Sequence, residues 1–517
     1  MREHLEQLLI VLAVGSAVAI VARRISVPYN VALVGVGLVL VLLKLLPETP
    51  MDPGVVLMVF LPILIFQGAL SADATSLRQA ARPILALAVP GVAMSLLATA
   101  TIASWEIGLP FPVALLLGAV LAITDTVSVL LAFRSVRVPH RLAAIMEGES
   151  LFNDGTALVF VSIAATVVVA GTVDVSQIGR MLFIAIVMGG LLGVMFGMLA
   201  TLILHRAPDD LTAVLASLVA AFSTALVTEH FHGSPVIAVV VAGVLVGQEM
   251  RRHLEPSRVL ALEGFWEIAA FITNVWLFLL VGIQLTADML FREAWPILLA
   301  VVALHVGRAV AVYGTLGLLR LTGDRTPSRW QHVMVFGNIK GALSMAAVLA
   351  LPAGVPYRDR LIAIVFGVTL VTLVTQALPF RYFLTWLGLA HGVQDETAEE
   401  CRAILIGARR AQAELDSLMA AGLLSRHDHA ARWAEFQRDI IDAEKQLRGV
   451  HEDSHGHVAM PAVLAARKAA ILDAARRGLI TDRTAARHVA GLDAQIIRIG
   501  VHADHAHGHR DAVKDAR

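Results

Sequence analysis

The run Glu147-Gly-Glu-Ser-Leu-Phe-Asn-Asp154 places three carboxylates in the middle of a long apolar stretch. An ionised side chain at bilayer depth costs roughly a few kcal/mol or more, so it seldom occurs there without a function or a partner. On a helix, Ser150 and Asp154 are four residues apart and share a face, and Glu149 and Asn153 share the next one. Carboxylate, hydroxyl and amide oxygens suit a proton or a small hard cation. The run therefore predicts an ion-binding site inside a membrane.

Two other apolar stretches carry polar residues near their centres. The stretch 110–133 contains Thr124-Asp125-Thr126, and the stretch 331–352 contains Gly337-Asn-Ile-Lys-Gly-Ala-Leu-Ser344. Glycines, hydroxyls and charges at this depth indicate interrupted helices, whose freed backbone groups line a polar cavity. The two stretches hold matching places in two halves of six apolar segments each. This pairing predicts an inverted-repeat transporter with its site at mid-membrane.

Two basic residues in apolar stretches need partners. Lys340 requires a buried anion, and we expect Glu149 to supply it, since the alternative of snorkelling to an interface fits poorly with its depth. Arg308 is in a similar position, and Glu267 is one candidate for its partner. Asn274 is expected to join helices by hydrogen bonding, because a lone intramembrane amide is more often such a contact than a ligand.

Thirteen apolar segments are long enough to cross about 30 Å of hydrocarbon. They lie near residues 6–22, 30–47, 54–71, 83–104, 110–133, 143–170, 181–205, 210–229, 234–249, 265–285, 295–319, 331–352 and 361–388. In the seventh, Gly189, Gly193 and Gly197 have the small-xxx-small spacing that permits close helix packing. We therefore predict an all-α polytopic membrane protein.

Composition divides the chain in two. Of its 517 residues 57% are hydrophobic, and the mean hydropathy is +0.74. Residues 390–517 hold 37 of the 82 charged side chains. We therefore predict a transmembrane domain over 1–389 and a soluble helical, His-rich tail over 390–517. The net charge of zero argues against a nucleic-acid partner. A single cysteine, Cys401, excludes an intrachain disulfide and fits a reducing compartment.

Basic residues concentrate in alternate loops, which predicts the orientation of the chain. The richer set is Arg23, Arg24, Arg78, Arg82, Arg134, Arg137, Arg141, Arg206, Arg251, Arg252, Arg258, Arg320, Arg325 and Arg329, against Arg180, Arg292, Arg358 and Arg360 in the opposite loops. The first set is expected to be cytoplasmic, which puts the N-terminus outside and the tail inside. The first segment resembles a signal peptide, but Arg23-Arg24 follow it and we expect it to be retained.

The periodicity of the tail sequence predicts helices near 396–422, 428–449, 460–477 and 482–500. The tail contains eleven histidines. His451-Glu-Asp-Ser-His455 matches the H-E-x-x-H pattern of zinc proteases. Its surroundings are acidic and small, with Gly456 and Pro461 following, which is typical of an exposed linker. A solvated tail is therefore favoured over a protease, with incidental metal binding or pH sensing by the histidines as further alternatives.

Several of these motifs together resemble the monovalent cation:proton antiporter-1 family, which includes bacterial sodium/proton antiporters and animal sodium/proton exchangers. The resemblance covers about residues 5–390. The motifs are Thr124-Asp125, Gly148-Glu-Ser-Leu-Phe-Asn-Asp-Gly155, Phe265-Trp-Glu267 and the run 337–344. It implies a thirteen-helix homodimer in the cell inner membrane, in which a core domain moves against a dimerisation domain.

The resemblance also implies roles for individual residues. Asp154 would carry the ion or the proton, and Ser150, Thr124 and Asp125 would complete a sodium site. Asn153, Glu149 and Lys340 would stabilise it. Relatives with Asn-Asp at this point resemble electroneutral exchangers, because one titrating carboxylate binds either one cation or one proton.

Three positions depart from the family pattern. Thr126 stands where proline is usual, Lys340 where arginine is usual, and Gln67 where glutamate is frequent. These departures leave the identity of the cation open. We expect electroneutral efflux of Na⁺ or Li⁺ coupled to proton entry, without cofactor or enzymatic activity. The alternatives are K⁺/H⁺ exchange by the same fold, an ion channel, or a sensor that signals through the tail.

Overall fold

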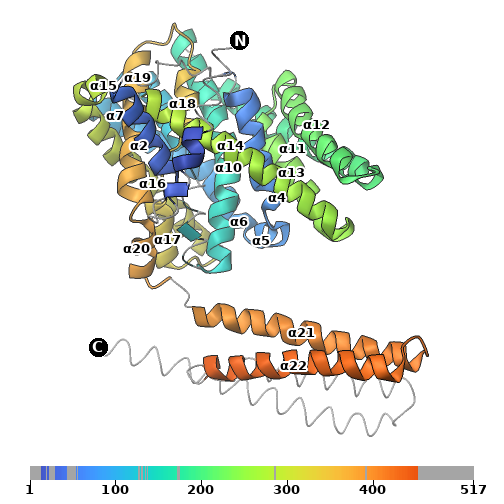
Figure 1. Ribbon diagram of the computed structural model, residues 1–517. Coiled ribbons are helices and arrows are strands. Elements are labelled where there is room, and N and C mark those ends of the chain that lie inside the picture. The colour runs from blue at the N-terminus through green and yellow to red at the C-terminus, as the bar shows by residue number, and fades with distance from the viewer. Residues whose placement is uncertain are drawn as a thin grey trace. The chain divides into compact units, whose positions relative to one another are not determined.

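The structure, a computed structural model, divides the chain into two compact units, Met1–His391 and Gly392–Arg517. It describes residues 13–18, 20–22, 29–43, 54, 56–125, 129, 132–133, 136, 138–171, 175–284, 287–389 and 393–451. Over these ranges the regular structure is helical and contains no strand, as predicted (Figure 1).

The helices of the first unit follow one another along the chain with mostly short connections. In order they are α2 (Tyr29–Leu42), the π-helical turn η1 (Val56–Phe60), α4 (Leu61–Ser71), α5 (Ala74–Gln79), α6 (Ala81–Ala86), the π-helical turn η2 (Leu87–Gly91), α7 (Val92–Glu106), α8 (Phe111–Ala122), α10 (His140–Ala170), α11 (Val175–Arg206), α12 (Asp210–His230), α13 (Pro235–His253), α14 (Pro256–Gln284), α15 (Ala287–Arg292), α16 (Ala294–Arg320), α17 (Ser328–Phe336), α18 (Ala342–Leu349), α19 (Arg358–Thr372), the π-helical turn η3 (Leu373–Ala377) and α20 (Phe380–Trp386).

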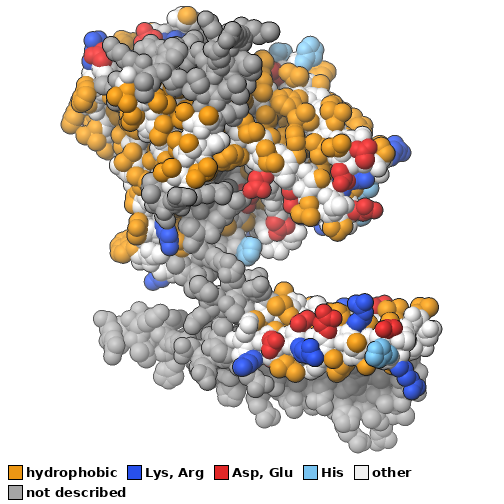
Figure 2. Space-filling model, in the orientation of Figure 1, with side chains coloured by type: hydrophobic (Ala, Val, Ile, Leu, Met, Phe, Trp, Pro, Cys, Tyr) orange, Lys and Arg blue, Asp and Glu red, His pale blue; other side chains and the backbone are white. Residues whose placement is uncertain are grey.

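Seven helices of the described residues are long and apolar enough to cross a membrane. They are Ala81–Glu106, His140–Val169, Ser176–Arg206, Asp210–His230, Pro256–Gln284, Ala294–Arg320 and Arg358–Ala377. Shorter apolar helices cover Ala13–Ala22, Tyr29–Val41, Val56–Ser71 and Phe111–Ala122. Hydrophobic side chains cover most of the described surface of this unit in Figure 2, as a lipid-facing surface requires. The predicted multi-pass architecture is confirmed, and the count of thirteen stays a prediction.

Two helices are interrupted where the sequence predicted it. α8 ends at Ala122, and the backbone continues extended through Ile123, with ψ of 134°. α17 and α18 are separated by residues 337–341. The breaks meet, because the amide of Asp125 donates to the carbonyl oxygen of Ile339 at 2.8 Å. Gly341 permits this approach, since a Cβ there would lie 2.6 Å from that of Asp125. Thr126 lies outside the described residues.

Buried apolar side chains form two clusters around the interrupted helices. The larger draws on α2, α7, α8, α10, the C-terminal half of α14 and α16 to α20, and the smaller on α4, α11 to α13 and the N-terminal half of α14. In Figure 1, α11 to α13 lie on one side of this unit and α16, α17, α19 and α20 on the other. The predicted close packing by the α11 glycines is present: a Cβ at Gly193 would come within 2.6 Å of the carbonyl oxygen of Ala238 on α13. The glycines of α11 therefore allow its backbone to pack directly against α13.

A similar close contact joins α13 to α4, and Gly247 provides a test of it. A Cβ at Gly247 would overlap the backbone carbonyl of Leu70, whereas a Cβ at Gly317 on α16 would meet nothing within 4 Å. Gly247→Ala is therefore expected to destabilise the protein by about 1–3 kcal/mol through overpacking. Gly317→Ala, the matched control, should be neutral or stabilising by about 1 kcal/mol, because alanine is the better helix former. Unfolding in detergent measures both, and equal effects of the two variants would contradict the packing.

The second unit contains a helical hairpin of α21 (Val393–Ala420) and α22 (Arg426–His451). These match the helices predicted near 396–422 and 428–449. Cys401 is buried between them, with its thiol sulfur 3.3 Å from Oε1 of Gln446. The two later predicted helices and all but the first residue of the H-E-x-x-H run lie outside the described residues.

Candidate ion-binding site

A cavity of about 140 Å³ opens beside the two helix breaks. Its apolar wall consists mainly of side chains of α4, α14 and α18, whereas α10 contributes mostly polar residues. The polar residues that line it are Gln67, Thr124, Asp125, Glu147, Ser150, Asp154 and Asn274. The structure thus brings all four residues predicted to bind the ion to one enclosure, although they come from two stretches of sequence. Such a mostly apolar cavity with a few convergent polar groups is typical of a small-ligand site.

Asp154 presents an unsatisfied oxygen within this arrangement. It lies on α10 one turn after Ser150, so both side chains share the face that lines the cavity. Among the described residues, Oδ1 of Asp154 is buried and has no hydrogen-bond partner. A buried acceptor without a partner is unusual and costs about 1–3 kcal/mol. A bound proton or cation would remove that cost.

Hydroxyl and amide groups connect α10 to the break in α8. The side-chain oxygens of Thr124 and Ser150 are 3.3 Å apart. The amide nitrogen of Asn153 donates to the Thr124 hydroxyl at 3.2 Å and to the carbonyl oxygen of Ala122 at 3.1 Å. That carbonyl lies at the C-terminal end of α8, where the last carbonyl oxygens have no amide donor within the helix. Asn153 therefore holds the unwound segment against α10 and leaves the Thr124 and Ser150 oxygens beside the cavity.

Glu149 pairs with a different residue from the one predicted. Its carboxylate accepts from Nη1 and Nη2 of Arg308 on α16, at 2.7 and 3.0 Å. Nε of Arg308 donates to the carbonyl oxygen of Met334 in the last turn of α17. The two charged side chains are 6% and 4% exposed. The predicted pairs Glu149–Lys340 and Arg308–Glu267 are wrong: Glu267 is exposed. A planar guanidinium matches a carboxylate with two parallel hydrogen bonds, which a lysine ammonium cannot do.

Lys340 instead stabilises the breaks themselves. It is fully buried, and Nζ donates to the carbonyl oxygen of Ile123 at 2.9 Å and to Oδ1 of Asn338 at 2.8 Å. The hydroxyl of Ser344 donates to the same Ile123 carbonyl. An interrupted helix leaves such carbonyls without amide donors, and the ammonium offers three donors at one point. Lys340 thus ties the break after α8 to the break between α17 and α18.

Sequence reasoning missed some of the groups around the site. The hydroxyl of Thr372 on α19 accepts a hydrogen bond from the backbone amide of Lys340 at 3.1 Å. Asn274, assigned to helix–helix bonding, lines the cavity from α14. In the sequence, the one indication of their role was their position deep within apolar segments. That position does not reveal the direction in which a side chain points.

A pair of interrupted helices that meet beside a carboxylate with one buried, unsatisfied oxygen is typical of a class of ion-transporting membrane proteins. Within that class the chain belongs to the sodium/hydrogen exchanger family, because the family model "Sodium/hydrogen exchanger, transmembrane" matches residues 9–386. This is a family of transporters.

Several relatives are similar over most of their length. The Na⁺/H⁺ antiporter NhaS2 of Synechocystis sp. is 35% identical and aligns over 96% of this chain and 93% of its own. The Na⁺/H⁺ antiporter ApNhaP of Aphanothece halophytica is 36% identical over 75% of this chain and 76% of its own. Two solved structures of the sodium proton antiporter MjNhaP1 from Methanocaldococcus jannaschii match at 19% identity, with TM-scores of 0.62 and 0.64, over 74% and 76% of this chain and 98% and 99% of theirs. They show a shared fold.

Proposed function

We propose that this protein exchanges Na⁺ or Li⁺ for H⁺ across a membrane, one for one, by alternating access to the cavity around Asp154. The observation that carries the proposal is the buried Oδ1 of Asp154, which has no hydrogen-bond partner among the described residues and lies in a cavity with Thr124, Asp125 and Ser150. Oxygen ligands of this kind suit a hard monovalent cation. The names of the relatives as Na⁺/H⁺ antiporters support the same ion pair.

Coupling of the two fluxes requires only competition for Asp154. A proton on the carboxylate removes the charge that would hold the cation, and a bound cation displaces the proton. A carboxylate carrying neither is too costly to move through a low-dielectric barrier. The protein therefore changes the side to which its site is open far more slowly when Asp154 is empty than when it carries a proton or a cation. Raising the pH lowers the competition from protons, so the apparent affinity for the cation should rise with pH.

Asn153 supports electroneutral rather than electrogenic exchange. An amide at this position adds no titrating charge beside Asp154, and both of its hydrogen bonds are donated to the backbone and hydroxyl of the α8 break. An ionised carboxylate has no hydrogen to donate and would lose those two bonds. Asn153 therefore serves the architecture of the site, while Asp154 carries the exchanged ion.

The proposed setting is the cell inner membrane, with a homodimer surrounded by lipid. The excess of arginines in alternate loops supports an outer N-terminus and a cytoplasmic tail. The domain division into 1–389 and 390–517, with transport in the first part, belongs to the same proposal.

The test is ion-driven pH change in proteoliposomes. Gradients of Na⁺, Li⁺ or K⁺ are imposed in turn, and an internal dye reports pH while the membrane potential is clamped at zero or at about 100 mV. We expect Na⁺ and Li⁺ to drive proton movement at a rate independent of potential. Movement of one net charge per cycle would change the driving force by about 2.3 kcal/mol at 100 mV, so a potential-dependent rate would contradict electroneutrality. A response to K⁺ alone would show that the exchanged cation is K⁺ and not Na⁺. A steady current at a clamped potential would indicate a channel.

A further inference from the structure

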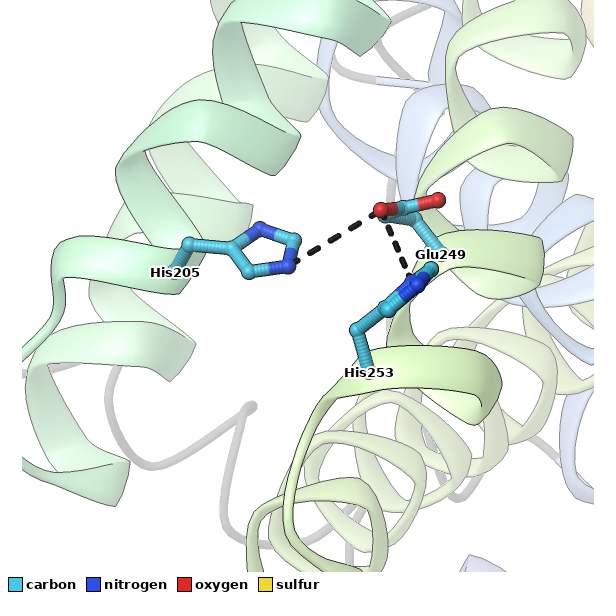
Figure 3. A group of neighbouring side chains, drawn as sticks. All are labelled: His205, Glu249 and His253. Carbon is cyan, nitrogen blue, oxygen red and sulfur yellow. Dashed lines mark ion pairs between the residues drawn. The ribbon is translucent and has the colours of Figure 1, made fainter.

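A second cluster of charged and metal-ligating side chains lies away from the cavity, at the C-terminal ends of α11 and α13. It consists of His205 from α11 and of Glu249 and His253 from α13 (Figure 3). The ligand atoms of the three residues lie within 4.8 Å of one another. Oε1 of Glu249 is 3.8 Å from Nε2 of His205 and 2.9 Å from Nδ1 of His253. The three side chains are partly exposed, so an ion could reach them from solution.

The packing of the two helices fixes this geometry. The residues of α11 that face α13 recur every four positions at Gly189, Gly193 and Gly197, and the same spacing leads through Thr201 to His205. On α13, Glu249 and His253 are one turn apart and share a face. Because the glycines bring the two backbones into contact, the His205 ring reaches the carboxylate of the neighbouring helix. Rigid positioning by packed helices is what a metal site needs to hold its ligands in place.

The hydrogen bond of His205 to its own helix determines which ring nitrogen is free. Nδ1 lies 2.8 Å from the carbonyl oxygen of Thr201, which can only accept, so Nδ1 carries the hydrogen. A neutral His205 then points the lone pair of Nε2 at Oε1 of Glu249, 3.8 Å away. That distance is too long for a hydrogen bond. Two acceptors that face each other across such a gap leave room for a cation between them. Metal-bound histidines commonly bond their second nitrogen to a carbonyl in this way.

The nearby arginines are directed to other partners. Arg251 donates to the carbonyl oxygens of Leu70 and Ala72, and Arg252 lies against the side-chain amide of Gln248. Among the described residues, both ion-pair partners of Glu249 are therefore histidines. The last turns of α11 and α13 end here side by side, and the partial negative charge of each C-terminus favours a cation.

From this geometry we propose that His205, Glu249 and His253 form a binding site for a divalent transition-metal ion, with Zn²⁺ as the best match. Tetrahedral zinc with ligands at about 2.0–2.1 Å separates its ligand atoms by about 3.3 Å. The contact at 3.8 Å must close by about 0.5 Å and the contact at 2.9 Å open by about 0.4 Å, and the two histidine nitrogens, which lie within 4.8 Å of each other, must come to the same separation through side-chain rotation. Water fills the fourth position. The ion fastens the end of α11 to the end of α13, and it takes no part in the proposed exchange.

The experiment uses full-length protein in which nine tail histidines are replaced by alanine to remove incidental binding. They are His427, His429, His451, His455, His457, His502, His505, His507 and His509. Co²⁺ is titrated as a spectroscopic substitute and then displaced by Zn²⁺. We expect one equivalent of Co²⁺ with the visible absorption of a four-coordinate ion. His205→Ala and Glu249→Gln should each weaken binding at least about tenfold, since loss of a ligand exceeds the effect of losing a supporting contact.

His230→Ala is the matched control, because His230 is an exposed histidine in the last turn of another helix, α12. It should bind Co²⁺ as the parent does. Ion-driven pH change in proteoliposomes, measured with a chelator present, should be the same for all variants and verifies that each is folded. Equal binding by His205→Ala and His230→Ala would overturn the site, and so would a parent protein that binds no Co²⁺ or Zn²⁺.

Discussion

Asp154→Asn is expected to reduce ion-driven proton movement to the rate of protein-free liposomes. The substitution keeps the size of the side chain but removes both the negative charge that attracts the cation and the group that accepts the proton. The hydroxyls of Thr124 and Ser150 cannot replace it, because they line the same cavity but carry no charge. Proteoliposomes with imposed Na⁺ or Li⁺ gradients measure the loss.

The folded state should survive this substitution. Oδ1 of Asp154 has no partner within the described part of the chain, so its replacement breaks few contacts. The change in unfolding free energy is expected to stay within about 1 kcal/mol. Asp288→Asn is the matched control, since Asp288 is 71% exposed and its one ion pair among the described residues is with Arg292, one turn away; it should transport normally. Substantial exchange by Asp154→Asn would contradict the assignment of Asp154 as the ion carrier.

Arg308→Met is expected to be the most destabilising single change near the site. It leaves the Glu149 carboxylate buried without its two hydrogen bonds and removes the donor to the Met334 carbonyl. Removal of one partner from a buried ion pair costs about 3–5 kcal/mol. Glu149→Met should cost a similar amount, because it leaves the guanidinium buried and unpaired. Reversible unfolding in detergent, monitored by tryptophan fluorescence, measures both variants.

The double variant Glu149→Met/Arg308→Met distinguishes the energy of the Glu149–Arg308 interaction from the effects of each single substitution. Two apolar side chains of similar volume leave no unpaired charge, so the double variant should be more stable than either single one. As a control, Arg292→Met removes an exposed pair with Asp288 and should cost less than about 0.5 kcal/mol. Additive effects of Glu149→Met and Arg308→Met would contradict the pairing. A rescue of Glu149→Met by Lys340→Met instead would support the pair that the sequence suggested.

These two predictions differ in what they rest on. Asp154 was assigned from its position in an apolar run beside a hydroxyl and an amide, and the structure adds a cavity and an unsatisfied oxygen. The partner of Arg308 could not be assigned in that way. Glu149 and Arg308 are 159 positions apart in the sequence, and the choice between Arg308 and Lys340 depended on which of two basic side chains points toward α10.

Local rules of sequence reading were sufficient for the elements. Apolar length predicted the spanning helices to within a few residues at α10, α12 and α16, because each must satisfy its backbone internally over the width of the hydrocarbon. Glycines and charges inside apolar segments predicted the breaks after Ala122 and between Phe336 and Ala342. The Gly189, Gly193 and Gly197 spacing predicted a close helix contact, although it did not identify α13 as the partner.

By itself, then, the amino-acid sequence determined that the protein is a multi-pass helical membrane protein, where two of its helices break, and that Asp154, Asp125, Ser150 and Thr124 are the polar residues to consider. These conclusions depend on hydrophobicity and on helical periodicity, which are properties of neighbouring residues. Only the tertiary structure decided that Arg308 neutralises Glu149, that Lys340 binds the freed carbonyl of Ile123, and that His205 meets Glu249 and His253. Each of these contacts joins helices far apart in the chain, and long-range pairing is set by how whole helices pack.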